Sequence, residues 1–458
     1  MVEQENKKKN LTMKLVNIHK HKLITLLLAI GLTAANAQVF TLKQCIDSAQ
    51  VYNKNLKISR NNIAIGQQKN KEAKANLLPK INANADYKYF TNLPYQLMPL
   101  SIFGGTEGKF KEAQFGVPHN INANLTLTMP LYNSQVYGAI QTSKIASELS
   151  NLQYWKTEEQ LFFDISNLYY NAQILKHQLE FIDGNLVNSN KLLKNIQLLK
   201  EQLLAKGTDV NKIKLQLAQL NTQRESIYSK QEQILNALKF AMGIAIEQKI
   251  IVENNIIFEN NSKENIEITN SNSLDVNISK VQNRIINSEL STFKKSKYIP
   301  SINLFGTYGT TGFGYDKQPN EFLKFFPIGF AGIQLNYPLF NGTVTQRKIN
   351  QKKLEQQNSE LQINLVSEQN NMQIQNVKMQ LLVAIKSVKT SEEQIQLAQL
   401  IYDQTLLQNQ EGTANITDII LADNSLREAQ QNNLNSIIEY MKANLELKKL
   451  TGNLSIKN

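Results

Sequence analysis

The chain has 458 residues and a formal net charge of +12, and its charges are scattered among many Asn and Gln residues without an aromatic-interleaved basic patch. We therefore attribute the net positive charge to a biased composition and not to nucleic-acid binding. The single cysteine, Cys45, excludes an intrachain disulfide and a thiol-rich metal site.

The N-terminus has the pattern of an export signal. Basic residues precede the apolar run 23–32, and Ala35-Asn36-Ala37 completes an A-x-A cleavage site. We therefore predict a signal peptide over 1–37, removed after Ala37, with Met13 as an alternative start to Met1. Cys45 lies well beyond that site, behind Lys43 and Gln44, and is predicted to be an ordinary helix cysteine without a lipid anchor.

The proline residues of the chain are confined to two windows. These are 79–130 and 300–338, with prolines at Pro79, Pro94, Pro99, Pro118, Pro130, Pro300, Pro319, Pro327 and Pro338. Because proline breaks helix interiors, the proline-free stretches 131–299 and 339–458 are the ones compatible with long helices.

Both windows show the period of β-strands. Apolar and polar residues alternate over about 81–90 and 120–129, and more weakly over about 301–309 and 329–337. Each run has the length of a tilted membrane strand, with apolar side chains facing lipid and polar ones facing a lumen. More than half of the Phe and Tyr residues lie in or beside these windows, as interfacial aromatic girdles would require. A soluble β-sandwich core is the alternative.

A long helix is predicted to follow the first window. The spacing of its apolar residues alternates between four and three, at Leu161, Ile165, Leu168, Ala172, Leu175, Leu179, Ile182 and Leu186. This heptad pattern is typical of coiled-coil packing. From Asn133 to about Lys206 the helix would be on the order of 110 Å long. A helix of this length is too long for a globular domain and is long enough to span a cellular compartment.

The two halves of the chain repeat each other. Pro130-Leu131-Tyr132-Asn133 matches Pro338-Leu339-Phe340-Asn341, and Asp209-Val210 matches Asp418-Ile419, at a nearly constant spacing. We predict a first repeat over 38–243, a partly extended connector over 244–271, a second repeat over 272–452 and a tail over 453–458.

Each repeat is predicted to contain a helix, two strands, a very long helix, a tight turn and a returning helix. Loops separate the paired strands at about 91–119 and 310–328. The helical hairpins turn near 205–209 and 410–415, where Gly207 and Gly412 are expected to adopt the left-handed conformation that ends a helix.

The order of these motifs resembles the outer-membrane efflux protein family, the TolC-like channels. The residues that match are Thr41-Leu42-Lys43-Gln44-Cys45-Ile46, Leu77-Leu78-Pro79, Pro338-Leu339-Phe340-Asn341-Gly342 and the segment from Gly412 to Ile419. The resemblance implies an α+β membrane protein in which each chain gives four transmembrane strands to a trimeric 12-stranded barrel. Long antiparallel coiled-coil helices then continue the barrel as a periplasmic α-barrel.

The same resemblance implies a passive conduit and no enzyme: a homotrimer in outer-membrane lipid, without a cofactor, coupled through a periplasmic adaptor protein to an inner-membrane pump for efflux or type I secretion. It assigns adaptor docking to the hairpin turns, at Gly207, Thr208, Gly412 and Thr413. It also assigns the barrel-to-helix junctions to Pro79, Pro130, Pro300 and Pro338. Four strands alone leave open edges, which independently requires several copies of the chain.

By the same resemblance, the periplasmic gate includes Asp418, and Asp209 is its counterpart in the first hairpin. Three copies of Asp418 would form an anionic ring around a pore; a solvated aspartate in the first helical turn is the alternative. The sequence departs from the family pattern at Asn409, Ala414 and Leu421, so a closed gate would use other contacts.

No catalytic motif accompanies these features. The sequence has no phosphate-binding glycine loop and no nucleophile elbow, and its histidines have no Cys, His or acidic cluster at metal-ligand spacing. The alternative to a conduit is a structural or adhesive coiled-coil protein of the outer membrane that transports nothing.

Overall fold

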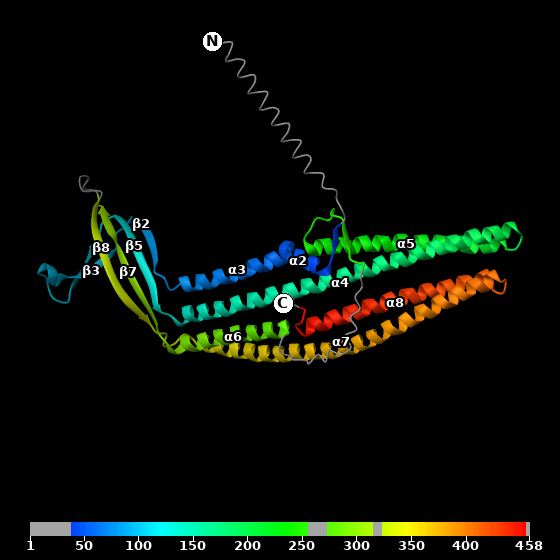
Figure 1. The fold of residues 1–458 in the computed structure, drawn as a ribbon. Helices are drawn as coiled ribbons and strands as arrows, with labels where there is room; N and C mark the ends of the chain where they lie inside the picture. Colours follow the sequence, from blue (N-terminus) through cyan, green and yellow to red (C-terminus); the bar gives the residue numbers. More distant parts are fainter. Residues whose placement is uncertain (1–37, 255–272, 315–322, 455–458) are drawn as a thin grey trace, which may run out of the picture. The chain divides into compact units, whose positions relative to one another are not determined.

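The computed structural model describes residues 38–254, 273–314 and 323–454 (Figure 1). The predicted signal peptide, most of the predicted connector and the centre of the second strand loop lie outside the described residues. Among the described helices, none combines the length and apolar character needed to cross a bilayer.

The four predicted strands form one antiparallel sheet. Its strands are β2 (Lys80–Tyr89), β5 (His119–Tyr132), β7 (Ser301–Gly314) and β8 (Lys324–Asn336), in the order β2-β5-β7-β8 (Figure 1). β5 and β7, from different repeats, pair in the middle of the sheet. β2 and β8 are the edges, and each has one side that no strand in the described part of the chain pairs.

The second strand pair is longer than predicted. β7 continues to Gly314 and β8 begins at Lys324, so the predicted loop at 310–328 is largely strand outside 315–322. The start of β8 was missed because Phe325 and Phe326 are neighbours in sequence and therefore point to opposite faces. Apolar residues on both faces remove the alternation by which a strand is recognised.

The first loop also contains secondary structure that the sequence did not predict. A small hairpin is made by β3 (Tyr95–Pro99) and β4 (Phe110–Gln114), with the short 3-10 helix η1 (Leu100–Phe103) between them. Pro94 and Pro99 border β3 and argue against a strand in sequence, but Pro99 is the last residue of β3 and lies opposite Phe110. The end of a short edge strand tolerates a proline.

The chain divides into two compact units that do not follow the repeats. One comprises Met1–Asn53, Leu161–Asn265 and Met379–Glu446, and the other Lys54–Gln160, Ile266–Lys378 and Leu447–Asn458. Each unit thus takes segments from both repeats.

The unit that contains the sheet also contains α3 (Lys54–Ala75), α6 (Leu274–Tyr298) and the beginnings of α4 (Ser134–Glu201) and α7 (Val344–Gln410). Pro79, Pro300 and Pro338 each lie between a strand and a helix. Pro130 lies instead inside β5, at a register shift against β7. A bulge tolerates a residue that cannot donate a ladder hydrogen bond.

The other unit contains α2 (Leu42–Tyr52), α5 (Gly207–Met242), α8 (Ile416–Leu450) as far as Glu446, and the remaining parts of α4 and α7. Thr41 begins α2 with a capping box: its hydroxyl accepts from the Gln44 backbone N–H at 3.2 Å, and the Gln44 side chain accepts from the Thr41 N–H at 3.0 Å. Two three-residue strands, β1 (Gln38–Phe40) and β6 (Ile250–Val252), pair in parallel, so part of the predicted connector is strand.

The eight predicted heptad positions of α4 are buried or half-buried. Ile165, Ala172 and Ile182 are buried. Towards the turns, residues from α4, α5, α7 and α8 share one core cluster: Ile196, Val210, Ile213, Leu217, Ala398, Tyr402, Ile416, Ile419, Ala422, Leu426 and Ala429. Fully burying an aliphatic side chain of this size contributes about 1.5–3 kcal/mol, so this cluster holds the two helical hairpins together.

Candidate gate at the helical hairpin turns

The second hairpin turns as the sequence predicts. α7 ends at Gln410, α8 begins at Ile416, and Gly412 between them has a φ of 75°. The backbone N–H of Thr413 donates to the Gln408 carbonyl at 2.9 Å, which satisfies one of the last carbonyls of α7.

The first hairpin contradicts the prediction for Gly207. Gly207 is the first residue of α5, and it is Leu203 that takes the left-handed conformation, with a φ of 63°. The Leu204 N–H donates to the Leu199 carbonyl at 2.8 Å, as Thr413 does in the second hairpin. The match of Asp209 with Asp418 already aligns Leu203 with Gly412, so the repeat was a better guide to the turn than the nearest glycine.

Both predicted gate carboxylates cap the helix that follows the turn. An Asp418 Oδ2 oxygen accepts from the Asn415 backbone N–H at 2.8 Å, and Asp209 Oδ2 accepts from the Lys206 N–H at 3.3 Å. Both side chains are half-buried. A carboxylate in the first turn is also favoured by the helix dipole, so each has a structural role whether or not it faces a pore.

The residues at which the sequence departs from the family pattern have local roles as well. The Asn409 side-chain amide donates to the Ala414 carbonyl at 2.8 Å and closes the turn from within. Leu421 is 60% exposed on α8 and contributes no charge there. Between the hairpins, Lys212 Nζ donates to Thr417 Oγ1 at 2.9 Å.

A buried polar network that the sequence analysis missed lies five residues beyond Asp418. Asp423 on α8 is buried; it accepts a hydrogen bond from Gln216 Nε2 on α5 and pairs with Arg427 Nη2 at 2.9 Å. Burial raises the pKa of the Asp423 carboxyl, against the opposing effects of Arg427 and Gln216. Burial also raises the pKa of neighbouring Tyr402 to about 12. The contact between Gln216 and Asp423 joins two hairpins that are far apart in sequence, so no local sequence pattern predicts it.

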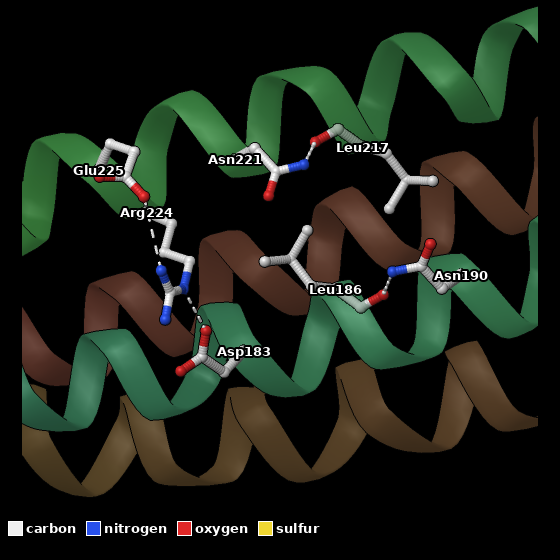
Figure 2. Close-up of polar contacts among 7 residues, drawn as sticks. All are labelled: Asp183, Leu186, Asn190, Leu217, Asn221, Arg224 and Glu225. Carbon is white, nitrogen blue, oxygen red and sulfur yellow. Dashed lines mark hydrogen bonds and ion pairs between the residues drawn. The ribbon is translucent and has the colours of Figure 1, made fainter.

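The two helices of the first hairpin are joined by an ion pair (Figure 2). Arg224 Nε on α5 lies 2.6 Å from Asp183 Oδ1 on α4, and Arg224 Nη1 lies 3.5 Å from Glu225 Oε1. The amides of Asn190 and Asn221 do not cross between helices, because each donates to a carbonyl one turn back in its own helix, at 2.8 and 2.9 Å. These two asparagine side chains are therefore satisfied within their own helices.

No group of three or more His, Cys, Asp or Glu side chains in the described ranges is placed to hold a metal ion. The four-stranded antiparallel sheet and the long paired helices agree with the fold that the resemblance to TolC-like channels implies.

Comparisons with known proteins support this class. Residues 292–453, in the second half of the chain, match the model of the family described as outer membrane efflux protein. The resemblance inferred from the sequence motifs is thereby confirmed. No curated protein sequence matches the chain significantly.

Several solved structures share the fold over nearly the whole chain. The outer membrane protein VceC of Vibrio cholerae is 15% identical, with a TM-score of 0.72, and the match covers 90% of this chain and 96% of that one. The CmeC outer membrane channel of Campylobacter jejuni is 13% identical, with a TM-score of 0.71 and coverage of 90% and 85%. The MtrE outer membrane channel of Neisseria gonorrhoeae, in its open state, is 15% identical, with a TM-score of 0.69 and coverage of 90% and 89%.

Proposed function

We propose that the chain is one subunit of a homotrimeric outer-membrane efflux channel, a passive conduit from periplasm to exterior. The observation that carries the proposal is the sheet of four antiparallel strands, whose two edges, β2 and β8, have no further strand partner among the described residues. Hydrocarbon does not tolerate open strand edges, and a barrel needs at least about eight strands. Several copies are therefore required, and the family resemblance supports three.

An exposed apolar seam on α7 supports the same assembly. Large apolar side chains recur along it at intervals of three, four or seven residues, and all are at least about half exposed: Leu354, Leu361, Leu365, Met372, Met379 and Leu382. Heptad spacing of this kind marks a face that packs against another helix. In the proposed channel, that helix belongs to a neighbouring subunit.

The hairpin turns are the proposed docking site of a periplasmic adaptor, which couples the channel to an inner-membrane pump. Leu203 and Leu204 are 93% and 73% exposed at the first turn. Thr208 and Thr413 add hydroxyl groups beside the turns, at exposed positions. Exposed leucines beside polar side chains are suited to a partner that buries them.

The gate proposal is that Asp418, with Asp209, lines the periplasmic end of the pore. Three copies of Asp418 would concentrate negative charge and attract cations. The capping hydrogen bond from Asn415 uses one carboxylate oxygen and leaves the other for a cation or a neighbouring subunit.

Single-channel recording in a planar lipid bilayer tests the function. The purified full-length protein should give stable conductance steps without any energy source. A structural or adhesive protein would give none, and failure to conduct under conditions where the protein is folded and inserted would overturn the proposal.

A further inference from the structure

The two faces of the sheet differ in chemistry, and the difference shows which one faces lipid. Large apolar side chains project from all four strands on one face, including Ile81, Leu125, Tyr308 and Ile333, which are 65%, 52%, 71% and 67% exposed. A lipid-facing surface must be apolar on every strand. This is therefore the outer face, and the opposite face lines the lumen.

The lumen face is polar along β2 and β5, and along β7 and β8 it carries large apolar side chains among polar ones such as Thr307 and Gln334. Residues directly opposite one another in an antiparallel pair share a face, which places Asn82, Asn84, Asp86, Asn122, Asn124 and Thr126 of β2 and β5 on it. The same register places Phe305, Phe313, Phe326, Ile328 and Phe330 of β7 and β8 on it as well. We call the first set the amide half and the second the phenyl stripe.

The amide half is hydrogen-bonded within itself. The Asn84 amide donates to Asn124 Oδ1 at 3.4 Å and to Thr126 Oγ1 at 3.3 Å, and the Asn122 amide donates to Asp86 Oδ2 at 3.2 Å. Thr311 Oγ1 donates to Asn122 Oδ1 at 3.1 Å and joins β7 to the network. These contacts order Asn84, Asn122 and Asn124 around one carboxylate, Asp86, and each of the three amides keeps capacity for a further hydrogen bond.

The phenyl stripe is exposed in this chain. Phe305 and Phe330 contact edge to face with ring centroids 6.3 Å apart, and Phe313 and Phe326 lie 6.0 Å apart. Phe326 and Phe330 are each 53% exposed. The unpaired side of β8 would be met by β2 of a neighbouring copy. The residues of β2 on this face are Lys80, Asn82, Asn84, Asp86 and Lys88, so the neighbour adds polar side chains there and no apolar cover.

The ionisable side chains on this face are Lys80 at one end and Asp86, Lys88 and Lys324 towards the other. Two successive cross-strand rows, Asn84-Asn124-Gly309-Ile328 and Asn82-Thr126-Thr307-Phe330, contain no ionisable side chain. A hydrated metal ion would find no fixed charge at these levels, whereas an aromatic molecule can stack on the phenyl groups.

On the basis of the proposed channel function, we propose that the phenyl stripe is a binding path for cargo that carries aromatic or other apolar groups. The side chains that determine this preference are Phe326 and Phe330, with Phe305, Phe313 and Ile328 extending the path. The neighbouring amides accept the polar parts of such molecules. The cargo class is therefore amphipathic organic molecules and not hydrated metal ions.

Block of single-channel current tests the proposal with two monovalent cations that differ in their phenyl groups. Tetraphenylphosphonium should block the parent channel at a lower concentration than tetraethylammonium. In Phe326→Ser/Phe330→Ser, the half-blocking concentration of tetraphenylphosphonium should rise about tenfold, because one aromatic contact strengthens binding by at most about a factor of ten. Block by tetraethylammonium should stay unchanged.

The matched control is Phe325→Ser, which removes the same ring from the lipid face of the same strand. It should leave block unchanged. Equal block of the parent by both cations, or an unaltered double variant, would overturn the phenyl stripe, as would a loss of block in the control alone. A parent protein without conductance would instead overturn the proposed channel function.

A labelling experiment covers the case in which the double variant does not assemble. Cys45 is fully buried and the only native thiol, so Phe330→Cys offers a single accessible site. A membrane-impermeant, water-soluble thiol reagent should lower its conductance in steps, and current that stays unchanged despite complete labelling would place residue 330 outside the lumen.

Discussion

At the scale of single residues, Leu203 carries a strain that its counterpart Gly412 avoids. A left-handed backbone costs a non-glycine residue about 1–2 kcal/mol, and this leucine is 93% exposed, so it recovers little by packing. A glycine at this position would cost roughly 0.4–1 kcal/mol of stability, because glycine gives the unfolded chain more conformational entropy. Leu203→Gly should therefore stabilise the protein by up to about 1 kcal/mol, seen as a higher midpoint of thermal unfolding by circular dichroism.

The reciprocal change, Gly412→Leu, is the control for Leu203→Gly. It should lower the same midpoint. If both changes shift the midpoint in the same direction, left-handed strain does not determine stability at these turns.

Asp423 should make stability depend on pH. Burial raises its pKa in the folded chain, so the folded state binds this proton more tightly than the unfolded state. The contribution of Asp423 to stability is therefore largest below about pH 4, the ordinary pKa of aspartate, and falls as the pH rises through the raised pKa. Asp423→Asn should melt at a higher temperature than the parent at neutral pH, with the difference shrinking towards pH 4.

Asp403→Asn is the control for Asp423→Asn, because Asp403 is exposed on nearby α7. It should show no such pH-dependent difference. An Asp423→Asn variant that melts lower than the parent at every pH would show that the pair with Arg427 outweighs the cost of burial.

The gate prediction belongs to Asp418. Asp418→Asn keeps a side-chain oxygen that can cap α8 but removes the charge, so folding should persist while cation selectivity and block by multivalent cations decrease. Without a second acidic residue at Leu421, block of the parent should already be weaker than two rings would give. Parent and variant currents that coincide across a cation series would leave Asp418 a helix-capping residue only.

At the scale of elements, α4 and α6 approach each other at Gly138. A Cβ built there would lie 2.0 Å from Thr292 Oγ1 and 2.7 Å from Thr292 Cβ, whereas one at Gly184 on the same helix would meet nothing within 4 Å. Gly138→Ala should cost about 1–3 kcal/mol by overpacking, and Gly184→Ala should stabilise by up to about 1 kcal/mol. Thermal melts of the two variants compare them, and partial rescue of Gly138→Ala by Thr292→Gly would confirm the contact.

The elements also show what could be read from the sequence. The strands with strict alternation, β2 and β5, were predicted to within a few residues, because one polar and one apolar face leave a two-residue period. β8 lost its beginning because Phe325 and Phe326 make both faces apolar. β1 and β6 are three residues long and pair across some two hundred positions, which no local pattern encodes. The Asp423 network was missed for the same reason, since Gln216 meets it only after both hairpins have packed.

At the scale of the whole molecule, the seam on α7 should decide assembly. Leu361→Glu places a charge in the seam, at a side chain 67% exposed in the single chain, and should shift the protein from trimer towards monomer in native mass spectrometry from detergent. Gln362→Glu introduces the same charge at the adjacent exposed position and should remain trimeric. A trimer that survives Leu361→Glu unchanged would exclude the seam from the subunit interface.

The unequal turns of the two repeats limit how regular a complex with a partner can be. A trimer would present six hairpin ends, three with Leu203 and Leu204 and three with Gly412 and Thr413. The duplication makes the helices nearly equivalent, but the ends alternate between a turn with exposed leucine side chains and a turn without large apolar side chains. A partner that engages all six must therefore recognise two different chemistries, and one that tolerates only a single kind will fill half of the places.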